Sequence, residues 1–138
     1  MLDQFKQVKV GIIPCNGEEI SEGTLTRFAC RKVLDSLRPQ DTVTICLPLF
    51  IAGDKGEQNF AKTFPTITVD GCEKRCSEKS TERLSGRPRF AIVVSELLKE
   101  RGAKPPSSRR TLTETDRVAI DLVAEEIARK VDEILKKG

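Results

Sequence analysis

Short β-branched runs alternate along this chain with segments of helical periodicity, and this alternation restricts the fold more than any other feature of the sequence. Strands alternating with helices form parallel sheets, and their right-handed crossovers place helices on both faces. The sequence therefore predicts a three-layer α/β fold with roughly four parallel strands, in the order 2-1-3-4. The four runs that read as buried strands lie at residues 8–13, 42–46, 66–69 and 90–94.

Helical patterns follow each of these strands. Ser21 is expected to cap the first helix, with Phe28 on its apolar face, and residues 47–49 are expected to extend the second strand. Thr113 and Asp116 are expected to open the last helix. The helices are expected over residues 21–37, 54–64, 72–85, 95–101 and 113–137.

The chain has 138 residues, which is close to the commonest size of one domain. No repeat, low-complexity tract or linker divides it. We therefore expect residues 1–138 to form a single α/β domain, similar in topology to half of a Rossmann-like or flavodoxin-like fold. A domain of this length can bury a core without a disulfide or a metal ion.

The chain contains no His, and this absence narrows the chemistry that it can perform. Ser-His-Asp and Cys-His nucleophiles are excluded. Neither the Gly-x-x-x-x-Gly-Lys-Ser/Thr phosphate loop nor the Gly-x-Gly-x-x-Gly dinucleotide loop occurs. The net charge of +3, from 24 basic and 21 acidic residues, is too balanced to indicate binding to nucleic acid or to a membrane surface.

No apolar stretch is long enough to span a bilayer, and we expect no signal peptide. Five cysteines in a chain without an export signal are expected to be reduced thiols in the cytoplasm. We expect them to serve metal or redox chemistry, and not structural disulfides.

Three cysteines lie at or just after the ends of three predicted strands: Cys15, Cys46 and Cys72. The carboxyl ends of parallel strands lie along one edge of a sheet, which is where ligands bind. Cys76 comes four residues after Cys72, so the two side chains share a face if that segment is helical. Four thiolates would complete a tetrahedral zinc site. The alternative is that these cysteines are small core hydrophobes.

Cys72 is expected at or near a helix N-terminus, where free N–H groups stabilise a thiolate, and Lys74, Arg75 and Lys79 would add to this effect. Cys30 lies within the first predicted helix, beside its apolar stripe. We expect Cys30 to be a core or half-buried thiol and not a ligand.

The motif Asp70-Gly71-Cys72, followed by Cys76, resembles the family of zinc-binding proteins named for its Asp-Gly-Cys motif, the DGC domain family. Cys15-Asn16-Gly17 and Cys46-Leu47-Pro48 add to the resemblance, which extends from about Val8 to the last helix. It implies that Cys15, Cys46, Cys72 and Cys76 bind zinc. Family members often have Cys-Ser-Gly at the first of these positions, and Asn16 leaves the thiol and the glycine in place. The family has no settled activity, so the resemblance implies a site and not a reaction.

Several residues are expected to support this site. Gly17 and Gly71 suit tight turns, and Gly71 is expected to have a positive φ. Asp70 is expected to cap the helix that follows, the alternative being a hydrogen bond to a metal-binding side chain. Glu18 and Glu19 are expected in a solvated loop. A basic loop that contains Arg109 and Arg110 precedes the last helix and is expected to be solvated.

The leading functional hypothesis is a zinc-binding protein with a storage, transfer, sensing or accessory role, because a closed four-thiolate shell favours these over catalysis. One alternative is a thiol-disulfide redox enzyme that uses Cys72 and a resolving cysteine. Another is an iron–sulfur protein with the same ligands. We expect a metal ion as the ligand, and the sequence leaves a protein partner open.

Overall fold

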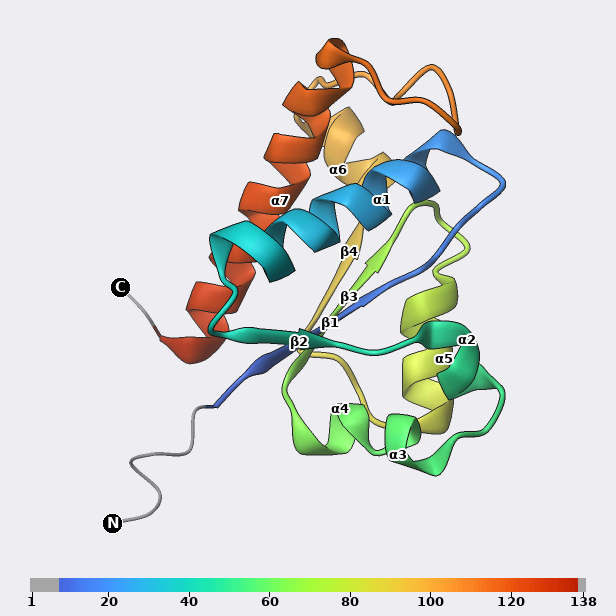
Figure 1. The fold of residues 1–138 in the computed structure, drawn as a ribbon, viewed down its shortest axis with the longest axis vertical. Coiled ribbons are helices and arrows are strands. Elements are labelled where there is room, and N and C mark those ends of the chain that lie inside the picture. The colour runs from blue at the N-terminus through green and yellow to red at the C-terminus, as the bar shows by residue number, and fades with distance from the viewer. Residues whose placement is uncertain (1–7, 137–138) are drawn as a thin grey trace.

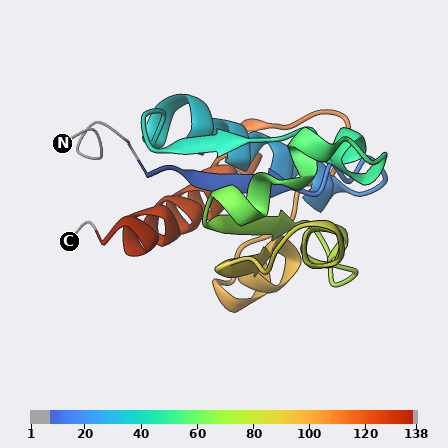
Figure 2. The same ribbon diagram turned by 90° about the horizontal axis from the view of Figure 1, so that it is seen from below.

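A computed structural model of the chain describes residues 8–136 and contains a four-stranded parallel sheet. The strand order is β2-β1-β3-β4, as predicted, and every neighbouring pair is parallel. Figure 1 shows helices on both sides of the sheet, and Figure 2 shows β2, β1 and β3 side by side in that order. The strands are β1 Val10–Pro14, β2 Thr42–Thr44, β3 Thr66–Asp70 and β4 Phe90–Val93.

The helices of the described residues differ in length from the predicted ones. The first predicted helix is divided into α1 and a π-helical turn, η2, and the second is divided into α3 and α4. Asp54 caps α3 by accepting a hydrogen bond of 2.9 Å from the N–H of Glu57. The helical elements are α1 Ser21–Lys32, η2 Val33–Leu37, α2 Leu47–Ile51, α3 Lys55–Gln58, α4 Phe60–Thr63, α5 Cys76–Leu84, α6 Val94–Glu100 and α7 Glu114–Leu135.

Two apolar layers sandwich the sheet. On one face, Val10, Ile12, Ile67 and Val69 pack against α1, α6 and α7. On the other face, a smaller cluster covers the sheet and includes Ile13. Because side chains alternate along a strand, Ile12 and Ile13 belong to opposite layers. The smaller cluster is formed by Ile13, Leu47, Phe50 and Phe60.

Three expectations for the first half of the chain were wrong. Residues 47–49 do not extend the second strand but begin α2, because Pro48 fits the first turn of a helix, where its missing N–H needs no partner. Ser21 does not cap α1, since Ile20 is the N-cap and the Ser21 hydroxyl bonds to Glu22. Phe28 lies at the margin of the apolar face and is 46% exposed.

The start of α7 matches its prediction. Thr113 is the N-cap, and the Asp116 carboxylate accepts a 2.7 Å hydrogen bond from the N–H of Thr113 in a capping box.

Among residues 8–136, no helix is long and apolar enough to cross a bilayer.

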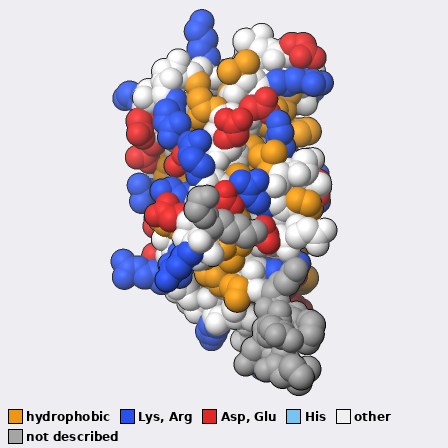
Figure 3. All heavy atoms as spheres, turned by 90° about the vertical axis from the view of Figure 1, so that its left-hand side faces the viewer, with side chains coloured by type: hydrophobic (Ala, Val, Ile, Leu, Met, Phe, Trp, Pro, Cys, Tyr) orange, Lys and Arg blue, Asp and Glu red, His pale blue; other side chains and the backbone are white. Residues whose placement is uncertain are grey.

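Ion pairs fix α7 against its neighbours. Lys32 pairs with Asp121, and Arg38 pairs with Asp132 at 2.7 Å, so α1 and η2 are joined to α7 at two levels. Figure 3 looks onto the α7 side of the molecule and shows basic and acidic side chains interleaved. This face therefore carries no large field of one sign.

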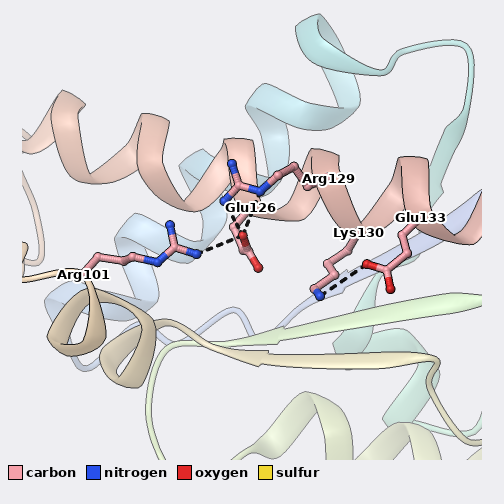
Figure 4. A network of polar contacts seen from close by, with 5 residues as sticks. All are labelled: Arg101, Glu126, Arg129, Lys130 and Glu133. Carbon is pink, nitrogen blue, oxygen red and sulfur yellow. Dashed lines mark hydrogen bonds and ion pairs between the residues drawn. The ribbon is translucent and has the colours of Figure 1, made fainter. Parts of the chain in front are cut away.

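The carboxylate of Glu126 joins the end of α6 to α7. It pairs with Arg101 at 3.2 Å and also with Arg129, while Lys130 pairs with Glu133 one turn further on (Figure 4). Partial burial raises the pKa of Glu126, but the hydrogen bonds and charges of Arg129 and Arg101 together lower it below its ordinary value. The network therefore stabilises the folded state when Glu126 is ionised.

We predict that Glu126→Gln lowers the free energy of unfolding by about 0.5–1 kcal/mol at pH 7, a value kept small because both arginines are more than one-third exposed. Because the folded-state pKa is depressed, this stabilisation is present above the ordinary pKa of a glutamate and is lost as the pH falls through the lowered value. Urea unfolding at several pH values measures it. Glu125→Gln, at the exposed neighbouring position, is the control. If both variants lowered the free energy of unfolding equally, the ion pairs of Glu126 would not be the source of the stabilisation.

Candidate metal centre

The four candidate cysteines all lie towards the carboxyl edge of the sheet, but they differ in exposure. Cys15 follows β1 and Cys72 follows β3, and both are half-buried. Cys46 is the exposed N-cap of α2, and Cys76 is the exposed first residue of α5. Cys30 is fully buried in the core between α1 and the sheet, as the sequence predicted.

Three of these thiols line one cavity of 530 Å³, which we call the thiol cavity: Cys15, Cys72 and Cys76. Cys46 is not part of its lining. Within residues 8–136, no group of three His, Cys, Asp or Glu side chains is close enough to hold a metal ion. The donor set therefore suits zinc in its chemistry, but the thiols are not gathered at coordination distance.

Cys72 and Cys76 do not share a helical face, so this expectation was wrong. The segment after β3 forms a turn in which the N–H of Arg75 bonds to the carbonyl of Cys72 at 3.2 Å. Arg75 is the N-cap of α5 and has a left-handed conformation with φ of 54°. The helix therefore begins at Cys76, and Cys72 is not at its N-terminus.

Asp70 determines where α5 begins. Its carboxylate is 2% exposed and accepts hydrogen bonds from the N–H groups of Ser77, at 2.7 Å, and Glu78, at 3.1 Å. These are N–H groups that the first turn of α5 leaves without partners. The Ser77 hydroxyl donates to the carbonyl of Ile13 at 2.7 Å and so ties α5 to β1. One carboxylate at the end of β3 thus positions the segment that carries Cys72 and Cys76.

Close backbone packing surrounds Cys15, whose Sγ accepts a 3.3 Å hydrogen bond from the N–H of Gly71. Gly71 does not have a positive φ, so that expectation was wrong. A Cβ on Gly71 would instead lie 2.9 Å from the nitrogen of Gly23, and a Cβ on Gly23 would lie 1.8 Å from the oxygen of Gly17. The absence of side chains at Gly17, Gly23 and Gly71 thus lets three backbone segments pack closely: the loop between β1 and α1 (residues 15–20, the Cys15 loop), α1 and the end of β3. Gly23 was not identified from the sequence, because its contacts depend on how the loop after β1 folds back on α1 and on the distant Gly71.

The Cys15 thiol is held in its neutral form. Burial raises its pKa, and the hydrogen bonds from Gly71 and Gly17 lower it by less. The charges of Asp70 and Cys76 raise it further. A cation in the thiol cavity would reverse this balance, because it stabilises a thiolate ligand directly.

Acidic side chains outnumber basic ones around the thiol cavity. Lys74 and Arg75 are the basic residues of its lining. Arg75 is engaged elsewhere, because it pairs with Glu78 at 3.3 Å and with Glu96 at 3.5 Å. The charge balance favours a cation over an anion. The acidic lining residues are Glu18, Glu19, Glu22, Asp70 and Glu73.

Comparison with known protein families gives one match: the model of the DGC domain matches residues 11–119. The matched segment contains all four candidate cysteines and the cap of α5. Neither the comparison with curated proteins nor that with solved structures gives a match.

We predict that Asp70→Ala lowers the free energy of unfolding by about 2–3 kcal/mol, because two buried N–H groups lose their acceptor. Asp54→Ala removes a cap of the same residue type from the exposed start of α3, and we expect a loss of about 0.5–1 kcal/mol. Urea unfolding of both variants measures the difference. Equal losses would show that the carboxylate of Asp70 does not hold the edge of the sheet.

We predict that Gly23→Ala destabilises the protein by at least about 2 kcal/mol, because the added Cβ would collide with the backbone of Gly17. Gly56→Ala, also within a helix, adds a Cβ whose nearest contact is a side-chain oxygen of Asp54 at 3.3 Å. It should change stability by less than about 1 kcal/mol. Thermal unfolding distinguishes them, and a tolerated Gly23→Ala would disprove the close backbone approach.

Proposed function

The chain belongs to the DGC domain family, and we propose that it binds one metal ion, preferably Zn²⁺, through the thiolates of Cys15, Cys46, Cys72 and Cys76. The proposed role is metal storage, transfer or sensing, or an accessory role, and not catalysis. We place it in the cytoplasm, where thiols stay reduced.

The observation that carries this proposal is that Cys15, Cys72 and Cys76 line one cavity at the carboxyl edge of the sheet. They come from two different segments, after β1 and after β3, so the fold and not proximity in the sequence brings Cys15 to the other two thiols. Cysteine thiolates are preferred ligands of Zn²⁺, and the acidic lining adds a field that favours a cation. Their partial exposure leaves a path for an ion to enter.

Cys46 would be the last ligand to join. It precedes α2, a five-residue helix anchored by Leu47 and Phe50, and it is exposed outside the thiol cavity. Completion of the shell would require this short segment to move towards the other thiols. A site that is partly assembled before binding suits exchange of the ion better than permanent retention.

The proposal assigns no reaction to the bound ion, because a shell of four thiolates leaves no open position for a substrate or an activated water. The redox alternative has one argument fewer, because α5 begins at Cys76 and Cys72 therefore does not lie at the N-terminus of that helix. An iron–sulfur cluster would use the same four ligands and is distinguished by experiment.

The first test is elemental analysis of protein purified anaerobically without a metal-affinity tag, with thiol titration before and after chelation. We expect about one zinc ion per chain and about four thiols that react only after the chelator is added. Cys30, fully buried, should react only when the protein unfolds. Protein that is purified without metal, and whose four thiols already react before any chelator is added, would contradict the proposal. Iron with visible absorbance would assign an iron–sulfur cluster instead.

Single substitutions identify the ligands. Serine at position 15, 46, 72 or 76 should reduce zinc retention during dialysis against a chelator by at least about tenfold, because each removes one thiolate. Cys30→Ala is the matched control and should retain zinc as the unaltered chain does. If Cys46→Ser also retained it, the site would consist of the cavity thiols alone.

A further inference from the structure

The loop between α6 and α7 is hydrogen-bonded to the start of α1 and to the loop that precedes it. Thr24 donates to the carbonyl of Arg109 at 2.7 Å, and the guanidinium of Arg109 donates to the carbonyl of Glu19 at 2.9 Å. Figure 1 shows this orange loop reaching the N-terminal end of α1. The hydrogen bonds hold residues 107–110 in place, so their side chains are presented from a fixed backbone.

Three arginine residues line two cavities at this position. Arg109 and Arg110 line two neighbouring cavities, of 460 and 370 Å³, and Arg27 of α1 lines the smaller one. Glu18 is the one carboxylate among the described residues that line either cavity. None of the three arginines forms an ion pair with a carboxylate in the described part of the chain. The positive charge of these two cavities, which we call the arginine groove, is therefore largely unbalanced by carboxylates.

Hydroxyl groups complete the donor set of the larger cavity, which Ser107 and Ser108 also line. The Ser108 oxygen accepts hydrogen bonds from the N–H groups of Arg110, at 3.0 Å, and Thr111, at 3.2 Å. Its own proton remains to be donated outward. Guanidinium forks and hydroxyl donors around a polar hollow match an anion with several acceptor oxygens.

We propose that the groove formed by Arg27, Ser107, Ser108, Arg109 and Arg110 binds the phosphate group of a small phosphorylated molecule. A phosphate has more acceptor oxygens and more charge than a carboxylate, and three guanidinium groups exceed what one carboxylate needs. The two hollows have the size of small-molecule sites. This site is separate from the thiol cavity, although both include Gly17 and Glu18 in their linings.

The test is titration of the zinc-loaded, isotope-labelled full chain with pyrophosphate at low ionic strength, followed by the backbone amide signals in NMR spectra. We expect saturable binding with a Kd below about 1 mM and the largest shifts at residues 107–110 and Arg27. Absence of saturation, or shifts centred elsewhere, would overturn the proposal. So would tight binding of a single-stranded oligonucleotide without saturable binding of pyrophosphate.

Paired variants test the assignment to these side chains. Arg27→Gln with Arg110→Gln removes two guanidinium groups that make no hydrogen bond to the described residues through their side chains, and it should weaken pyrophosphate binding by at least about tenfold. Arg83→Gln with Arg87→Gln makes the same charge change near the opposite edge of the sheet and should weaken binding less than about twofold. If both variants lost the same affinity for pyrophosphate, the effect would come from net charge alone, and the proposal would be overturned. Zinc content, measured in parallel, keeps this result independent of the metal centre.

Discussion

The structure of the carboxyl edge of the sheet depends on the hydrogen bonds that the buried carboxylate of Asp70 accepts. Asp70 ends β3 and caps α5 through the N–H groups of Ser77 and Glu78. These hydrogen bonds hold the turn between β3 and α5 close to the end of the strand. Cys72 and Cys76 therefore reach the cavity that Cys15 also lines. Burial raises the pKa of Asp70, and its hydrogen bonds offset part of that cost. Its position is fixed by backbone groups and not by another charged side chain.

The close approach of Gly17, Gly23 and Gly71 gives the same edge its second constraint. Without side chains at these positions, the Cys15 loop and the end of β3 come close enough for the N–H of Gly71 to reach the sulfur of Cys15. This contact buries a thiol that prefers to be neutral, beside an acidic lining that disfavours a further negative charge. Both effects would be relieved by a bound cation, so the electrostatics and the chemistry of the ligands favour the same occupant.

Much of the fold followed from local patterns. The alternation of strands and helices predicted the parallel sheet, although it did not by itself determine the strand order, and the capping box at Thr113 predicted the start of α7. The errors arose where contacts within the folded structure decide the local conformation. The carboxylate of Asp70, which was predicted as a cap, accepts from the N–H groups of Ser77 and Glu78, so α5 begins at Cys76 and not at Cys72. Gly71 is required by its contact with Gly23 of α1 and not by its own φ. That contact links residues far apart in sequence, so turn preferences do not reveal it. The strand ends predicted that Cys15, Cys46 and Cys72 would meet at one edge. Cys15 and Cys72 line one cavity together with Cys76, but Cys46 lies outside it, and its exposed position depends on where α2 begins.

X-ray absorption spectroscopy at the zinc edge tests the central claim most directly, because it counts the atoms bound to the ion. We predict a shell of about four sulfur atoms at about 2.3 Å, with the sulfur count falling by about one in Cys46→Ser. A shell dominated by oxygen or nitrogen at about 2.0–2.2 Å would contradict this prediction, because the ion would then be held by groups other than the thiols at the edge of the sheet.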